Sequence, residues 1–297
     1  MTAPRPAYGP RLAWGLVRLA TAGVIVAAVI SQLGTTVSIA EDRGWHLPTV
    51  VGNFFSFFTI LANIAAAVVL AIAGIWVLAR GAVKRYEPHA LSVMIVATGT
   101  YMVITGIVYN LLLRGIPLDQ GATVPWSNEV AHVIAPLILL VELILRVARR
   151  PVPWWTIWIV VAFPILWVVY TLARGEHITN PRTGQAWWYP YPFLNPYLTA
   201  NGYLGVAFWI LVIAALIIAV ASIAVWWTRR RRVVTDVSTT DEPTTDDDAV
   251  EVPAPADAPP PAPADMIAAT EPPAATVPDA DPPPSPASVL PEHRGDV

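Results

Sequence analysis

Residues 52–63 read Gly-Asn-Phe-Phe-Ser-Phe-Phe-Thr-Ile-Leu-Ala-Asn and begin the second long apolar stretch of the chain. The segment combines four phenylalanines with four polar side chains, which are Asn53, Ser56, Thr59 and Asn63. At about 100° per residue, the polar side chains fall on one stripe of an α-helix. A helix surrounded by lipid gains nothing from such a stripe. The segment therefore predicts a membrane helix that packs against other helices or lines a cavity.

The composition is that of an integral membrane protein. Of the 297 residues, 55% are hydrophobic and 13% are charged, whereas about 25% are charged in a soluble domain. Cysteine is absent, which excludes disulfides and thiolate metal sites. No two histidines have metal-ligand spacing, and no nucleotide-binding glycine loop is present. We therefore expect no metal, no cofactor and no nucleic-acid partner.

Hydropathy predicts an all-α, polytopic membrane bundle of six spans. Their expected bounds are residues 12–33, 49–78, 91–113, 124–145, 154–172 and 198–227. Lys and Arg gather at alternate connections, for example at Arg80, Lys84 and Arg85 and again at 229–232. Because cytoplasmic loops carry an excess of Lys and Arg, both termini are predicted to be cytoplasmic. The expected location is the plasma membrane of a bacterial-type cell.

The chain divides into three regions with different compositions. Residues 1–11 form a short cytoplasmic N-terminus, residues 12–228 the membrane domain, and residues 229–297 a tail. The tail is rich in proline, alanine and acidic residues and has no aromatic side chain after residue 232. Such a segment cannot bury enough apolar surface to fold alone, so it is predicted to be disordered. Its partner, if it has one, is unknown.

Polar side chains also occur in two other spans, near the predicted outer ends. Asn110 lies late in the third span, and Asn128, Glu129 and His132 lie early in the fourth. At 1.5 Å per residue, Thr59 and His132 reach a similar depth, roughly 10 Å from the outer surface. Buried polar groups in a membrane are costly, so each one is expected to have a partner or a function.

Two interpretations of these residues are open. In the first, they hydrogen-bond between helices and hold the bundle together. In the second, His132 is a general base beside a hydroxyl nucleophile, Thr59 or Ser56, and Glu129 orients its ring. The reaction would then need an oxyanion donor, for which the candidates are Asn53, Asn63, Asn110 and Asn128.

Glu142 lies ten residues after His132, in the predicted cytoplasmic half of the fourth span. We expect it to pair with Arg146, one helical turn later, and to extend toward water. A role in proton relay is the alternative, because intramembrane carboxylates often serve proton pathways.

Several motifs together resemble a known family. They are residues 53–63, Tyr109-Asn110, Asn128-x-x-x-His132-x-x-x-Pro136, and the Tyr-Pro-Tyr-Pro-Phe-Leu-Asn-Pro of residues 189–196 followed by Gly202-Tyr203. Over about residues 12–227 this combination resembles the bacterial Pr-six-Pr membrane proteins. It is more distantly similar to the eukaryotic androgen-induced and androgen-dependent multi-span threonine hydrolases. The resemblance implies an intramembrane hydrolase of fatty acid esters with Thr59 as nucleophile and His132 as base. The Asp-Trp pair common late in the fourth span of the bacterial family is replaced here by Glu142-Leu143.

The hydrolase would act on a membrane lipid ester that enters an outer-leaflet cavity, with its acyl chains among Phe54, Phe55, Phe57 and Phe58. A small-molecule or proton-coupled transporter or sensor is a second hypothesis, suggested by the polar stripe and Glu142. Many transporters contain half-length, broken spans, and we predict none here, which is an argument against this hypothesis. A third hypothesis is a non-catalytic scaffold whose acidic tail recruits a cytoplasmic partner.

Overall fold

The computed structural model of the chain describes residues 8–84, 86–116, 123–145, 147 and 149–230. Every regular element within these residues is a helix. Six helical segments are long and apolar enough to cross a membrane, so the multi-pass architecture predicted from the sequence is confirmed in outline. The tail that we predicted to be disordered lies, beyond Arg230, outside the described residues.

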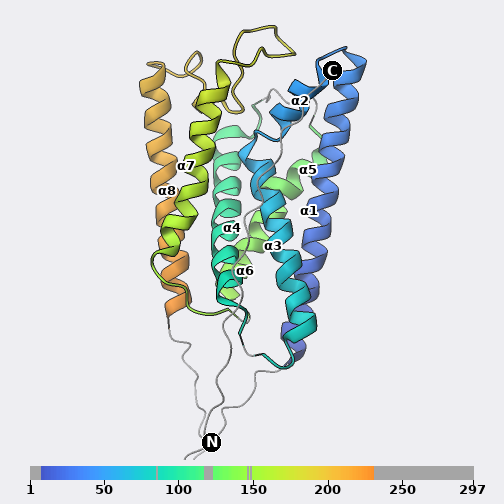
Figure 1. Cartoon of the computed structure of the whole chain (residues 1–297), viewed down its shortest axis with the longest axis vertical. Helices are drawn as coiled ribbons and strands as arrows, with labels where there is room; N and C mark the ends of the chain where they lie inside the picture. Colours follow the sequence, from blue (N-terminus) through green and yellow to red (C-terminus); the bar gives the residue numbers. More distant parts are fainter. Residues whose placement is uncertain (1–7, 85, 117–122, 146, 148, 231–297) are drawn as a thin grey trace, which may run out of the picture. The chain divides into compact units, whose positions relative to one another are not determined.

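The spans run alternately between two ends of the bundle, called here the upper end and the lower end as they lie in Figure 1. Helix α1 (Tyr8–Asp42) rises to the upper end, where the short α2 (Leu47–Phe54) follows, and α3 (Phe58–Arg80) descends. The chain returns through α4 (His89–Val108) and a π-helical turn, η1 (Tyr109–Leu113). It descends through α5 (Pro125–Glu129), a second π-helical turn, η2 (Val130–Ile134), and α6 (Ala135–Leu145). Helix α7 (Thr156–Gly175) then rises, and after a loop with a short turn, η3 (Pro192–Leu194), α8 (Tyr203–Arg229) descends.

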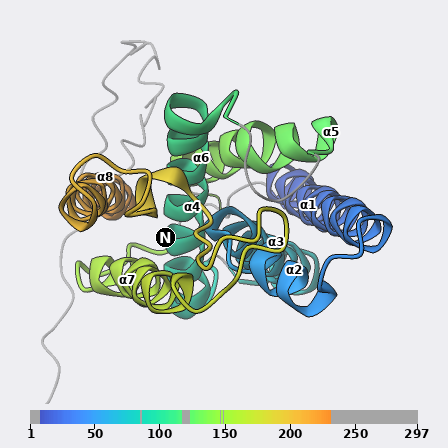
Figure 2. The same cartoon turned by 90° about the horizontal axis from the view of Figure 1, so that it is seen from above.

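Helix α4 lies in the middle of the bundle, with α3, α6, α7 and α8 around it (Figure 2). In its membrane-crossing window 72% of the residues are buried, compared with 17% in α8. Glycines allow this close packing, as small residues commonly do between membrane helices. A Cβ atom on Gly99 would come within 2.9 Å of Leu143, and one on Gly106 within 2.9 Å of Pro136. Helix α4 therefore rests directly on the segment η2–α6.

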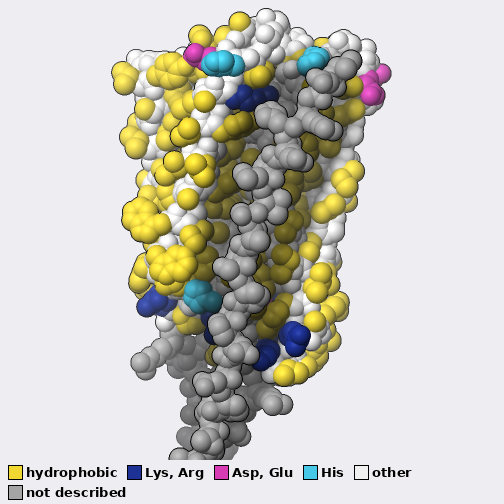
Figure 3. Space-filling model, viewed as in Figure 1, with side chains coloured by type: hydrophobic (Ala, Val, Ile, Leu, Met, Phe, Trp, Pro, Cys, Tyr) yellow, Lys and Arg dark blue, Asp and Glu magenta, His cyan; other side chains and the backbone are white. Residues whose placement is uncertain are grey.

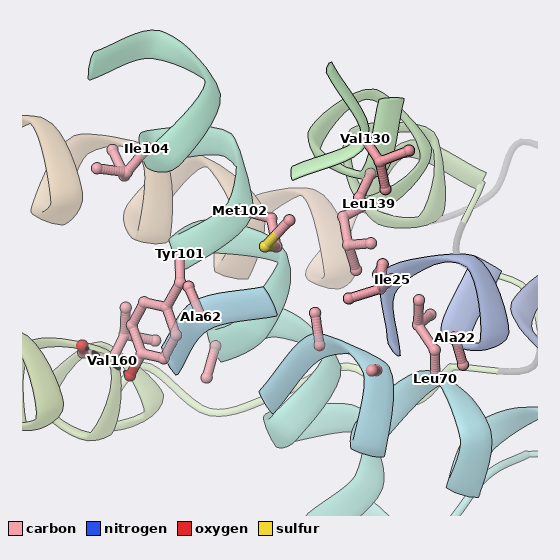
Figure 4. Close-up of a cluster of buried hydrophobic side chains, with 14 of the residues drawn as sticks. Ala22, Ile25, Ala62, Leu70, Tyr101, Met102, Ile104, Val130, Leu139 and Val160 are labelled. Atoms are coloured by element: carbon pink, nitrogen blue, oxygen red, sulfur yellow. Dashed lines mark hydrogen bonds between the residues drawn. The ribbon is translucent and has the colours of Figure 1, made fainter. Parts of the chain in front are cut away.

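A hydrophobic cluster joins the helices around α4. Figure 4 shows Ile25 of α1, Leu70 of α3, Met102 of α4 and Leu139 of α6 converging. The outer surface is also apolar: on the face seen in Figure 3, hydrophobic side chains predominate along both sides at mid-height, and charged side chains lie near the two ends. This distribution is the one that a hydrocarbon layer of about 30 Å requires.

The first helix is longer than predicted, because Gly34 does not end it. The Thr36 hydroxyl donates to the Gln32 carbonyl at 2.8 Å within the continuing helix. The helix ends at Asp42, shortly before Gly44, whose φ of +65° is easily adopted by glycine.

The second predicted span, residues 49–78, is divided into two helices, and the one long enough to cross a membrane is α3. Residues 55–57 separate α2 from α3, and Phe57 is extended, with φ −72° and ψ 126°. Other groups satisfy the backbone at the break, since the Trp167 indole donates to the Ser56 carbonyl at 2.9 Å. The Ser56 hydroxyl donates to the Gly52 carbonyl at 2.7 Å. As a result, Thr59 lies in the first turn of α3, whereas Ser56 belongs to the break.

Candidate functional site

Thr59 lies where α3 begins, a position at which backbone N–H groups lack partners within the helix. The residue before the helix, Phe57, supplies no side-chain cap. The cap comes instead from Tyr191, whose hydroxyl is 3.3 Å from the Thr59 backbone nitrogen and 3.2 Å from Thr59 Oγ1. Both residues are buried. A tyrosine from a loop far away in the sequence therefore accepts a hydrogen bond from a backbone N–H in the first turn of α3.

Aromatic packing places Tyr191 at this point. The Tyr191 ring lies edge-on to Phe57, at a centroid distance of 5.5 Å, and stacks on Phe193 at 5.2 Å. The start of the loop is held where the Trp188 backbone N–H donates to the Gly175 carbonyl at 2.8 Å. Burial raises the pKa of the Tyr191 hydroxyl, which therefore keeps its proton at neutral pH.

His132 lies in the π-helical turn η2, and its ring is fixed from two sides. Its Nδ1 is 3.0 Å from the Asn128 carbonyl oxygen. A carbonyl only accepts, so Nδ1 carries the proton of a neutral ring and the Nε2 lone pair can accept one. The ring stacks on Tyr109 of η1, with 3.8 Å between centroids, and the Asn128 amide donates to the Tyr109 hydroxyl at 2.6 Å. Two π-helical turns thus form one side of the site, as such turns often do at functional sites.

Thr59 and His132 line one small cavity of about 30 Å³ near the upper end of the bundle. Space of this size accommodates one or two water molecules. Its lining mixes polar and apolar residues, which are Val29, Gln32, Phe57, Thr59, Ile60, Ser127, Asn128, Ala131, His132 and Tyr191. Among the described contacts, the Thr59 hydroxyl bonds Tyr191 and not His132. The two predicted residues therefore meet across a cavity, without a direct hydrogen bond.

A larger apolar cavity of about 100 Å³ also reaches the hydroxyl groups of Thr59 and Tyr191. Apart from Thr59, Thr105 and the tyrosines, its lining is hydrophobic and comes from α3, α4, α7, α8 and the α7–α8 loop, including Phe58, Ile104, Val108, Trp167, Phe193 and Ile213. Thr59 and Tyr191 line both cavities. The pair is consequently accessible from both cavities.

Two of the predicted asparagines support the backbone of the site. The Asn63 amide donates to the carbonyls of Thr59, at 2.9 Å, and Ala131, at 3.3 Å. The Asn110 amide donates to the carbonyls of Gly106, at 2.8 Å, and His132, at 3.1 Å. These bonds connect α3 and η1 to η2, which is the interhelical role that the first interpretation expects.

The remaining predicted residues lie away from the Thr59 hydroxyl. Asn53 accepts a hydrogen bond from Arg174 at 2.7 Å, and Ser56 bonds the Tyr170 hydroxyl at 3.1 Å. Glu129 forms a half-exposed ion pair with Arg114 at 3.3 Å. The ring-orienting role expected of Glu129 is therefore filled by the Asn128 carbonyl.

Glu142 does not extend toward water, so that prediction was wrong. It is fully buried near the lower end, where Arg18 donates to it at 2.7 and 2.9 Å and Arg149 at 3.1 Å. Arg18 also pairs with the buried Glu87 at 2.5 Å. Arg146, the expected partner, lies outside the described residues. Sequence reasoning missed Arg18, although a charged residue within an apolar run was a usable signal.

No protein-family model matches this chain, and no match was found among curated proteins or solved structures. The described residues contain no group of three or more His, Cys, Asp or Glu side chains that is arranged to hold a metal ion. The resemblance to the Pr-six-Pr proteins and threonine hydrolases stays a hypothesis carried by the motifs. The functional argument depends on the geometry of the two cavities.

Proposed function

We propose that this protein is an intramembrane hydrolase of lipid esters, with Thr59 as the nucleophile and His132 as the general base. One observation carries the proposal: Thr59 lines both a larger apolar cavity and the small cavity that it shares with His132. An acyl chain suits the first space and water the second. Hydrolysis of a lipid ester requires that both the ester and water reach the Thr59 hydroxyl.

The proposed reaction has two steps. In the first, Thr59 Oγ1 bonds to the ester carbonyl carbon while its proton passes to His132 Nε2, directly or through one water molecule. The carbonyl–alkoxy bond breaks, and the alkoxide leaves as an alcohol with the proton from His132. In the second step, His132 takes a proton from water, whose oxygen attacks the acyl-Thr59 ester. The acyl–Thr59 bond breaks, His132 gives its proton to the Thr59 oxygen, and the fatty acid and the free Thr59 hydroxyl result.

The proposal includes an orientation. The lower end carries Arg11, Arg80, Lys84 and Arg150, and an excess of positive charge marks a cytoplasmic face. The site near the upper end then lies in the outer-leaflet half, and both termini are cytoplasmic. The substrate class is a membrane lipid ester, and the expected membrane is a bacterial-type plasma membrane.

A fluorophosphonate probe tests this function, because it phosphonylates activated hydroxyl nucleophiles. The purified protein should be labelled on Thr59, and Thr59→Ala and His132→Ala should each abolish the labelling. Ser56→Ala is the matched control and should leave labelling unchanged, since Ser56 bonds Gly52 and Tyr170. A folded wild-type protein that resists the probe and hydrolyses no lipid ester contradicts the proposal.

A small-molecule or proton-coupled transporter is the competing function, and the interruption at residues 55–57 is the feature that favours it, because transporters often bind substrates where a helix is interrupted. Glu142, to which this hypothesis assigns proton relay, argues against it. Glu142 is enclosed by two arginines, and a carboxylate held in this way is poorly suited to exchange protons. If proteoliposomes show flux of a small solute and Glu142→Gln abolishes it, the transporter is favoured over the hydrolase.

A further inference from the structure

The proposed reaction develops negative charge on the ester carbonyl oxygen, and pre-positioned donors must stabilise it. The asparagines considered for this role are occupied. Asn63 and Asn110 each direct their amide nitrogen at two backbone carbonyls. Asn128 donates to Tyr109, and Asn53 lies beside Arg174.

We propose that Tyr191 is a further catalytic residue, which donates its hydroxyl hydrogen to the oxyanion together with the backbone N–H of Thr59. This inference rests on the proposed hydrolase function. Its basis is position: of the described tyrosines, Tyr191 is the one whose hydroxyl lies within hydrogen-bond distance of Thr59.

The distances agree with this role. In a tetrahedral adduct, the oxyanion and the Thr59 oxygen are bound to the same carbon, so the oxyanion lies close to Oγ1. The Tyr191 oxygen is 3.2 Å from Oγ1 and 3.3 Å from the Thr59 nitrogen. An oxygen atom placed beside Oγ1 can therefore approach both donors at the 2.7–3.1 Å that stabilisation of an oxyanion requires.

The surroundings fix the position of the Tyr191 ring and keep its hydroxyl protonated. Its ring is enclosed by Phe57, Trp167 and Phe193, so the hydroxyl needs little reorganisation during the reaction. The positive end of the α3 dipole lies at Thr59 and adds to the stabilisation of an anion. The raised pKa of Tyr191 keeps the hydroxyl a donor throughout the neutral pH range.

Tyr191→Phe removes the hydroxyl and keeps the ring. We expect kcat for a lipid ester and the probe-labelling rate to fall about 100-fold, as when one oxyanion donor is removed from other hydrolases, with KM changed less than about threefold. Tyr170→Phe is the matched control, because it removes a hydroxyl that bonds Ser56 and not Thr59. It should keep the wild-type rate.

The outcomes separate the two proposals. If Thr59 is labelled in the wild type and Tyr191→Phe reacts at the same rate, the hydrolase stands and the role of Tyr191 is refuted. If the wild type is not labelled, both proposals fall. An equal loss of rate in Tyr170→Phe also contradicts a specific role for Tyr191.

A second measurement does not depend on how the phenylalanine variant folds. Incorporation of a fluorinated tyrosine at position 191 lowers the pKa of the phenol with little change in shape. If Tyr191 donates to the oxyanion, kcat changes with the acidity of the phenol, because a more acidic hydroxyl is a stronger hydrogen-bond donor. A kcat equal to that of the wild type contradicts the proposal.

Discussion

Replacement of Arg18 by methionine tests the buried ion cluster at the lower end, which we define as Arg18, Glu87, Glu142 and Arg149. The four side chains are almost entirely buried and balance two positive charges with two negative ones. Arg18→Met leaves two carboxylates and one guanidinium, a net charge of −1. Breaking a buried ion pair by removing one partner costs about 3–5 kcal/mol, and we expect a loss of this size in the free energy of unfolding.

The double variant Arg18→Met/Glu87→Gln restores the balance, because Glu142 keeps its bond to Arg149 at 3.1 Å. We expect it to be more stable than the single variant by about 1 kcal/mol or more, within the usual range of coupling between contacting residues. Arg114→Met is the control for a half-exposed ion pair and should cost at most about 1 kcal/mol.

The assay is unfolding in detergent micelles by titration with a denaturing surfactant, followed by tryptophan fluorescence. The reasoning is refuted if Arg18→Met and Arg114→Met lose the same stability. It is also refuted if the double variant is less stable than Arg18→Met, because the cluster then acts through packing and not through charge.

Three further predictions follow from the contacts. Asn63→Leu removes two hydrogen bonds to buried carbonyls and should lower the free energy of unfolding by about 1–3 kcal/mol, measured in the same micelle titration. Gly175→Ala should cost about 1–3 kcal/mol, because its Cβ would lie 2.2 Å from the Tyr189 ring; an unchanged titration midpoint would contradict this. Glu129→Gln should change the probe-labelling rate less than twofold, since Glu129 pairs with Arg114, and a loss as large as that of His132→Ala would restore its orienting role.

Much of the bundle was predictable because long apolar runs have few alternatives in a membrane, where helices satisfy their own backbone. The paired depth of Thr59 and His132 followed from counting 1.5 Å per residue within such runs. The break at residues 55–57 was not predictable in this way. It depends on a hydrogen bond from Trp167 to Ser56, which comes from another helix and leaves no mark in local periodicity.

The partners in the ion cluster also could not be predicted from local sequence spacing. A search for helical neighbours pairs Glu142 with Arg146, because side chains four residues apart adjoin on one helix. In the structure Glu142 bonds Arg18, which is 124 residues away in the sequence. An unpaired charge cannot remain in the bilayer, so Arg18 itself required an acidic partner. Only the fold determines which acid that partner is.

Tyr191 connects the stability of the break with the proposed chemistry. The first N–H groups of a helix have no partner within the helix, so a group from elsewhere must bond them. The Tyr191 hydroxyl does this for Thr59. An oxyanion needs the same donors, an N–H at a helix start and a neutral hydroxyl, and it would arise where these donors already meet. We therefore expect Tyr191→Phe to lower the free energy of unfolding by only about 1 kcal/mol, the value of a single cap, while it lowers the rate about 100-fold. A cap without a catalytic role would show the first effect and not the second.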